Sequence, residues 1–146
     1  MAFQGKPHTF AGDFLKLIFN ATTIANLANN ASSSPVTNLY ASLHTADPVA
    51  GDQTTNEAAY TSYARVAVVR TSSGWTITTN SVSPVSDIVF PTATGGSETE
   101  THLGIGTASS GSGILLWSCK LPPGGIVVTT GEVPTIRASS TIVEDV

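Results

Sequence analysis

The segment from Leu39 to Val69 constrains the fold of this chain more than any other part. Two runs with a period of two residues flank a loop rich in Asp, Gly, Thr and Asn; they are Leu39/Ala41/Leu43 and Tyr63/Arg65/Ala67/Val69. Successive side chains of a strand point to opposite faces, so each run predicts a half-buried strand. The loop between them is polar and well supplied with turn formers.

The composition favours strands and turns over long solvated helices. Only 11% of the 146 residues are charged, against about 25% in an average domain. Ser, Thr, Gly, Asn and Pro replace them, and Thr and Val suit pleated strands while Ser, Asn and Gly disfavour helix interiors. The length predicts one domain that can fold without disulfides or metal. The low charge fits equally a surface covered by neighbouring subunits and an ordinary weakly charged domain.

Short strands separated by turn signals are predicted along the rest of the chain. We expect them at about 38–44, 62–70, 74–79, 86–90, 99–106, 113–119 and 125–130, with a C-terminal pair near 133–144. This spacing indicates a mainly β protein, a jelly-roll-like β-sandwich or barrel of about eight strands with one N-terminal α-helix. The predicted core comprises Ile77, Ile88, Phe90, Leu103, Ile105, Leu115, Trp117 and Val127.

The N-terminal part of the chain predicts an arm followed by a helix. Apolar residues recur at helical spacing over 11–29, which predicts a helix that covers the sheet. Residues 1–10 contain Gly and Pro and no core of their own, so they predict an arm that is disordered or docks onto a neighbouring subunit through Phe3 and Phe10. The remaining residues, 11–146, are predicted to form a single domain.

The turn Ser72-Ser73-Gly74 is predicted to join the strands at 62–70 and 74–79 as a tight hairpin.

The charge distribution argues against nucleic acid and membranes as partners. The net charge is −4 and the six Lys and Arg residues are scattered, so no basic stripe is available to neutralise phosphates. No apolar run approaches the roughly 20 residues of a membrane span, and the N-terminus lacks a signal-peptide pattern. We expect a soluble product made in the cytoplasm.

Two sets of polar residues have the residue types of a chemical site. His44, Asp47 and Asp52 fall in the first loop, where a metal site can be imagined, but metal sites need three or more convergent ligands at recognisable spacing. We favour a turn in which Asp47 binds the following backbone. No metal and no cofactor is predicted.

Glu98, Glu100 and His102 alternate along one predicted strand, with the carboxylates roughly 7 Å apart, inside the range that glycosidases use. A strand face turned to solvent is the favoured interpretation. Cys119, the single cysteine, is interpreted as a small buried thiol. With no other catalytic motif present, no enzyme is predicted.

Aromatic residues gather near the first strands, and interface contacts are enriched in Tyr and Trp. Core packing is the expected fate of Tyr63 and Trp75. Tyr60 lies at a loop edge and is the preferred contact residue, with Tyr40 as a second. The predicted partner interface is therefore Phe3, Phe10, Tyr40 and Tyr60.

Several of these segments resemble a group of small tailed-bacteriophage virion proteins. Members have an "LYxxLHTADP" strand and loop, a "YxxYARVAV" strand, an "FP" turn and a "GI…GxLL" hairpin. The corresponding segments here are Leu39–Pro48, Tyr60–Val68, Phe90-Pro91, Gly104-Ile105 and Gly113–Leu116. The resemblance covers most of the chain after residue 38 and includes capsid cement, or decoration, proteins and relatives often described as tail fibre proteins.

The resemblance implies a role in the virion, and the physical features favour a capsid cement protein. Such a protein would bind the major capsid protein and copies of itself, as a dimer or trimer, on the outer capsid surface, because an acidic face would be repelled by packaged DNA. One alternative is a tail-associated structural protein, such as a fibre, adaptor or baseplate subunit. The other is a glycan-binding β-sandwich that would use Tyr60.

Overall fold

A computed structural model of the chain describes residues 8–23 and 36–143. Among these residues lie one helix and eleven short strands, which confirms the predicted mainly β fold with one N-terminal helix and is consistent with a sandwich-like arrangement. Among the described residues, no helix is long and apolar enough to cross a membrane. The elements are α1 (His8–Asn20), β1 (Asn38–His44), β2 (Val66–Val69), β3 (Trp75–Thr78), β4 (Ser81–Pro84), β5 (Ile88–Val89), β6 (Ser97–Glu100), β7 (His102–Gly106), β8 (Leu115–Lys120), β9 (Ile126–Thr129), β10 (Thr135–Ile136) and β11 (Ile142–Val143).

The chain divides into two compact units, each built from separate stretches of sequence. Unit 1 comprises residues 1–37, 69–87 and 137–146, and unit 2 comprises residues 38–68 and 88–136. The predicted single domain over 11–146 stays a prediction.

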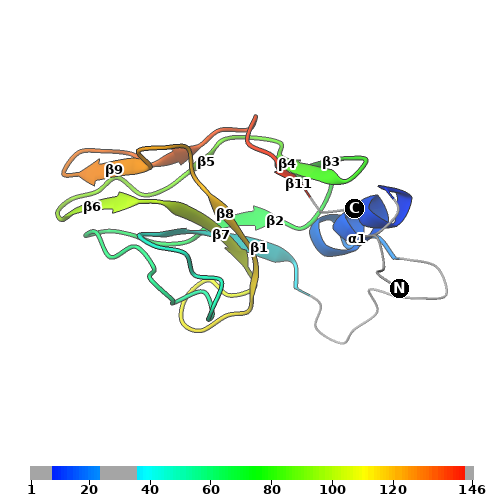
Figure 1. The fold of residues 1–146 in the computed structure, drawn as a ribbon, viewed down its shortest axis with the longest axis horizontal. Helices are drawn as coiled ribbons and strands as arrows, with labels where there is room; N and C mark the ends of the chain where they lie inside the picture. The colour runs from blue at the N-terminus through cyan, green and yellow to red at the C-terminus, as the bar shows by residue number, and fades with distance from the viewer. Residues whose placement is uncertain (1–7, 24–35, 144–146) are drawn as a thin grey trace, which may run out of the picture. The chain divides into compact units, whose positions relative to one another are not determined.

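Unit 2 contains a four-stranded sheet in the order β2-β1-β7-β8 (Figure 1). β1 pairs antiparallel with β7, and β7 pairs antiparallel with β8. Two further pairs, β5 with β10 and β6 with β9, are antiparallel two-stranded sheets. The predicted strand at 99–106 is therefore two strands, β6 and β7, which pair with different partners.

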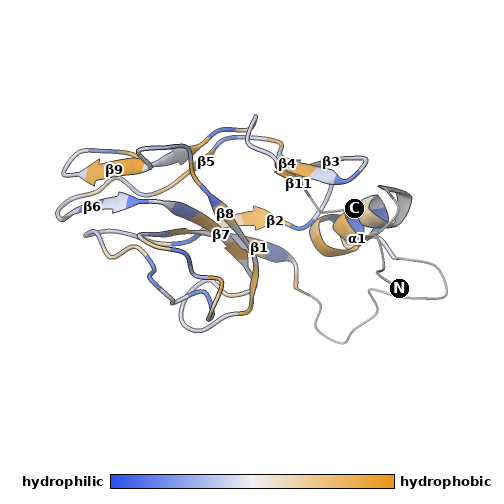
Figure 2. Cartoon of the chain, viewed as in Figure 1, coloured by the Kyte–Doolittle hydropathy of each residue, from blue (hydrophilic) through white to orange (hydrophobic). Residues whose placement is uncertain are grey.

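The core of unit 2 follows the alternation of its strands. Leu43 and Ile105 are fully buried, and the predicted core residues Ile88, Phe90 and Leu103 are also buried. Val127 was predicted to be buried, but its side chain is 61% exposed and Val128 is buried instead. Because side chains of a strand alternate between faces, a shift of one residue exchanges the two positions. Figure 2 shows β9 coloured as hydrophobic throughout, so hydropathy alone could not decide between them.

Leu115 and Trp117 were also predicted to be buried, and both are only half-buried. They belong to β8, the last strand of the four-stranded sheet. A terminal strand has a neighbour on one side only, so its core-facing residues stay partly accessible.

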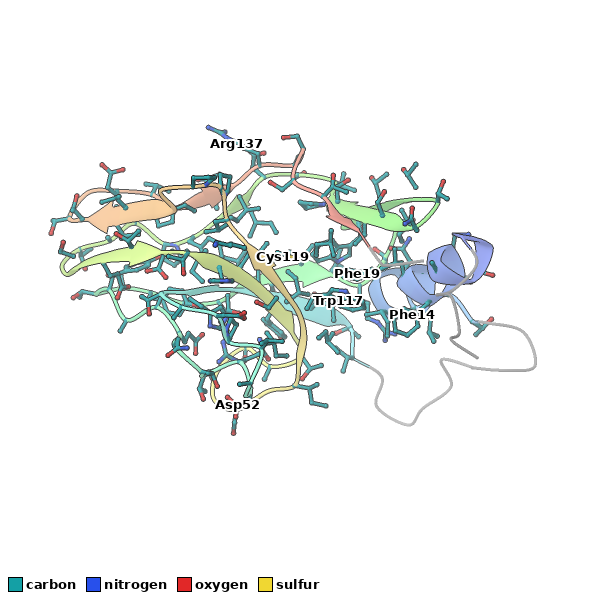
Figure 3. All side chains as sticks on the ribbon, viewed as in Figure 1. Phe14, Phe19, Asp52, Trp117, Cys119 and Arg137 are labelled. Atoms are coloured by element: carbon teal, nitrogen blue, oxygen red, sulfur yellow. The ribbon has the colours of Figure 1, made fainter. Side chains whose placement is uncertain are left out.

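Unit 1 consists of α1 and a three-stranded sheet in the order β11-β4-β3. The helix contacts β3 and β4, and its buried face carries Leu15 and Phe19. Phe19 meets Trp75 of β3 edge to face, with the ring centroids 4.7 Å apart (Figure 3 labels Phe19). Trp75 is buried as predicted, whereas Ile77 of the same strand is half-buried.

The helix differs from the predicted span of 11–29. It begins three residues earlier, at His8, and ends at Asn20. Ala21 follows with φ of 53°, the left-handed conformation that ends many helices. The Arg70 guanidinium donates hydrogen bonds to the carbonyls of Leu17 and Ile18 and so caps the last turn. Residues 24–29 lie outside the described part of the chain.

The predicted hairpin through Ser72-Ser73-Gly74 is wrong. β3 pairs with β4, with Trp75 opposite Pro84, and not with β2. The sequence of β4, SVSP, is only four residues long and ends in a proline, so it gave no strand signal. The two predicted C-terminal strands near 133–144 are present as β10 and β11, and β10 pairs with β5 while β11 pairs with β4.

Candidate functional site

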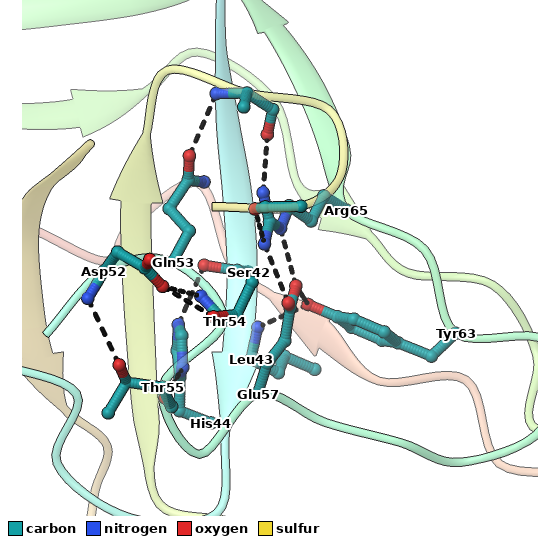
Figure 4. Close-up of polar contacts among 12 residues, drawn as sticks. Ser42, Leu43, His44, Asp52, Gln53, Thr54, Thr55, Glu57, Tyr63 and Arg65 are labelled. Atoms are coloured by element: carbon teal, nitrogen blue, oxygen red, sulfur yellow. Dashed lines mark hydrogen bonds and ion pairs between the residues drawn. The ribbon is translucent and has the colours of Figure 1, made fainter. Parts of the chain in front are cut away.

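A buried ion pair is the centre of a polar cluster in unit 2 (Figure 4). Arg65 donates from Nε to Glu57 Oε1 at 2.6 Å and from Nη2 to Glu57 Oε2 at 2.7 Å. The two side chains are only 2% and 18% exposed. The hydrogen bonds to Glu57 raise the pKa of Arg65. This two-pronged geometry is the strongest form of Arg–carboxylate pairing.

The same cluster holds together segments that are far apart in sequence. Arg65 also donates to the carbonyls of Ala108 (2.9 Å) and Gly111 (2.8 Å) in the loop between β7 and β8. Tyr63 donates its hydroxyl proton to Glu57 at 3.0 Å and accepts from the Leu43 amide of β1. One arginine and one tyrosine thus fix two loops against the sheet.

Ser42 and His44 form a second, fully buried part of the cluster. His44 Nδ1 lies 2.9 Å from the Thr55 carbonyl, and a carbonyl can only accept, so this nitrogen carries the proton. Nε2 then accepts from the Ser42 hydroxyl at 2.8 Å. Burial lowers the pKa of His44. The pair has the atoms of a nucleophile and its base, but it is sealed from solvent and anchors the loop through Thr55.

Gln53 fills the space beneath the same loop. Its side chain is fully buried and its Oε1 accepts from the Ala108 amide at 2.9 Å. A Cβ atom on Gly106 would lie 2.1 Å from the Gln53 carboxamide carbon, and one on Gly113 would lie 2.1 Å from its oxygen. Both positions therefore require glycine.

The carboxylates of the first loop act as turn formers. Asp47 Oδ1 accepts from the Val49 amide at 3.0 Å, as predicted. Asp52 Oδ1 accepts from the amide and the hydroxyl of Thr54, and these bonds lower its pKa. Within residues 8–23 and 36–143, no three His, Cys, Asp or Glu side chains come together as a metal site.

The expectation that Glu98 and Glu100 face solvent is wrong. Glu100 is fully buried and, as a carboxylate, neither of its oxygens has a hydrogen-bond donor. Burial, the hydrogen bond with Glu98 and the Glu98 charge raise the pKa of Glu100 to about 8. Glu98 Oε1 accepts from the amides of Ala59 and Tyr60. Glu100 is thus a protonated acid at neutral pH that can donate to Glu98.

The predicted partner interface stays a prediction, and its four residues fall in different parts of the chain. Phe3 lies outside the described residues, and Phe10 lies within α1. Tyr40 is half-buried in β1. Tyr60 was expected to be exposed, but it is 3% exposed and donates its hydroxyl proton to the Pro91 carbonyl at 3.0 Å. Burial raises its pKa to about 12.

Unit 2 also contains a shallow, mostly apolar pocket of about 750 Å³. Its lining holds no acid, histidine or cysteine, and its charged residue is Lys120. The lining residues are Thr101, Lys120, Leu121, Pro122, Pro123, Gly124 and Gly125.

Sequence reasoning missed Gln53, Glu57 and Arg65 as the centre of the cluster. Arg65 did carry a signal, because it falls in an alternating run predicted to be half-buried, although the later members of that run, Ala67 and Val69, are exposed in the structure. A charged residue at such a position needs a buried partner. Its partner, Glu57, could not be identified from spacing because it comes from an irregular loop.

Residues 18–144 match the family described as podophage GP4 fiber I protein gp80, and the chain belongs to this family. It is therefore a phage virion structural protein. No curated protein matches the chain.

Proposed function

We propose that this chain is a structural subunit of the phage tail, of the fibre type, and that its role is non-catalytic. The single observation that carries the proposal is the family match, which extends over residues 18–144. It supports the tail-associated alternative over the capsid cement interpretation, for which the low charge was the main support.

The chemistry of unit 2 agrees with a structural role. Its buried serine–histidine pair and its arginine–glutamate pair each bind a loop backbone. Rigid loops on a sheet scaffold are what a subunit needs to present a constant surface to its neighbours.

Location in the virion tests the proposal directly. Gold-labelled antibody raised against the purified chain is expected to decorate the tail, and quantitative mass spectrometry of purified particles is expected to give far fewer copies than of the major capsid protein. Label over the head, with a copy number near that of the major capsid protein, would overturn the proposal in favour of capsid cement.

A further inference from the structure

The outer edge of β8 has the properties of an interface strand. β8 is the last of the four strands in its sheet, and it carries Leu115, Leu116, Trp117 and Cys119, all half-buried. Ile114, directly before it, is 68% exposed. Edge strands that stay single are protected by charge, proline or shortness. β8 is six residues long and its one charge, Lys120, lies at its end.

Two rows of apolar side chains, which cross the strands of the sheet, end at this edge. Leu43 of β1 lies opposite Leu103 of β7, which lies opposite Cys119 of β8. Leu43 and Leu103 are buried, whereas Cys119 is half-buried. A second row ends in the same way at Trp117 (Figure 3 labels Trp117 and Cys119). Another strand beside β8 would continue both rows.

The hydrogen-bond pattern identifies which backbone groups of β8 point outward. The Leu121 amide donates to the Thr101 carbonyl at 2.8 Å, which continues the register that places His102 opposite Lys120. Backbone groups alternate in direction along a strand, so Cys119 bonds towards β7. Ser118 and Lys120 therefore direct their amides and carbonyls to the outside.

Charge fixes one register for a second copy. Ser118 donates to Asp47 Oδ1 at 3.4 Å, which places an exposed carboxylate beside Ser118. Lys120 is exposed and makes no ion pair among the described residues. If Ser118 of one copy lies opposite Lys120 of the other, each ammonium meets the other copy's Asp47. The outward backbone groups of the same two residues then bond each other.

We propose that β8 pairs antiparallel with β8 of a second copy of this chain, about a two-fold axis at Cys119, to form a continuous eight-stranded sheet. The two Cys119 residues form the central non-hydrogen-bonded pair, with Cα atoms about 4.5 Å apart. On that face Trp117 meets Leu121 of the other copy, so the exposed ends of the apolar rows become buried. The pairing is isologous and therefore closes as a dimer.

The single cysteine makes the register measurable, since a Cα separation of about 4.5 Å lies within disulfide range. Diamide oxidation of the full chain takes two electrons and two protons from the paired thiols, and we expect a disulfide-linked dimer on a non-reducing gel. Cys119→Ser abolishes the cross-link and leaves the dimer seen by sedimentation. In that background Ser118→Cys, displaced from the axis, is expected to cross-link at least about tenfold more slowly.

Exchanging the charges of Lys120 and Asp47 tests the same register without a cross-linking reaction. Lys120→Glu is expected to weaken dimerisation by about tenfold or more, because two attractions become repulsions. Asp47→Lys in addition is expected to restore it, and thermal melts confirm that each variant is folded. A chain that is monomeric at all concentrations overturns the proposal, as does faster cross-linking at position 118 than at 119. These results do not depend on where the subunit lies in the virion. They therefore test the proposed dimer separately from the proposed place of the subunit in the tail.

Discussion

At the scale of single residues, the structure uses two opposite ways of burying charge. Arg65 and Glu57 form a two-pronged ion pair, while burial, together with the neighbouring acid Glu98, raises the pKa of Glu100 and favours its neutral form. The two solutions respond differently to mutation and to pH, since only the second depends on a proton taken from solvent.

Arg65→Met is expected to lower the free energy of unfolding by about 3 kcal/mol or more, because it leaves the Glu57 carboxylate without its cation and two loop carbonyls without a donor. Denaturant titration measures the change. Arg137→Met is the matched control, because the Arg137–Asp87 pair is exposed, at 74% and 36%. That variant is expected to cost under about 1 kcal/mol. Equal effects in the two variants would contradict the role given to Arg65.

Glu100 is expected to make the protein less stable as the pH rises. Its pKa is about 8 in the folded chain and near 4.5 when unfolded, so between these values only the folded state holds the proton. Stability therefore falls as pH increases from about 5 to about 8, by on the order of 1 kcal/mol per pH unit.

The variant Glu100→Gln isolates this effect, because the amide can still donate to Glu98 but does not titrate. Thermal melts from pH 5 to pH 8 should show a flatter profile for Glu100→Gln than for the natural chain, with the variant more stable at pH 8. Glu132→Gln, at an exposed position, is the control and should keep the natural slope. Parallel profiles for all three proteins would show that Glu100 is ionised when folded.

At the scale of elements, α1 depends on a residue outside its own sequence. Arg70→Met removes the donors to the Leu17 and Ile18 carbonyls at the helix C-terminus. We expect a loss of roughly 1–2 kcal/mol in stability together with reduced helical circular dichroism. Lys16→Met, which removes an exposed pair with Asp13 in the same helix, should change neither measurably.

The elements also show which parts of the fold could be predicted from sequence. β1 was predicted with its observed bounds because the apolar residues Leu39, Ala41 and Leu43 alternate regularly along it. The partner of β3 could not be predicted, because the turn at Ser72–Gly74 and the turn at Thr79-Asn80 carry similar local signals. In the structure β3 pairs with β4 across the second of these turns, with Trp75 opposite Pro84.

The candidate site was less predictable than the fold. Asp47 formed the expected turn because that interaction is local in sequence. Glu100 was misplaced because period-two spacing gives the face on which a residue lies but not which face is covered. Tyr60 was misplaced because its cover comes from the distant Pro91 segment.

At the scale of the whole molecule, the low charge predicts an assembly that tolerates salt. The proposed dimer has only two ion pairs, each worth at most about 1 kcal/mol. Raising NaCl from 0.05 to 1 M is therefore expected to weaken dimerisation by less than about thirtyfold, because apolar contacts and backbone hydrogen bonds remain. Sedimentation at both salt concentrations measures this change. A loss of dimer larger than that would mean that charge dominates the interface.

The division of the chain into interleaved units also orders events during synthesis. All of unit 2 precedes residue 137, whereas unit 1 needs β11, which pairs with β4 across about sixty residues of sequence. Translation proceeds from the N-terminus, so α1 is made before all of unit 2, and unit 1 is complete only once β11 has been synthesised after it. A nascent chain stalled before that strand would contain all of unit 2 and only part of unit 1.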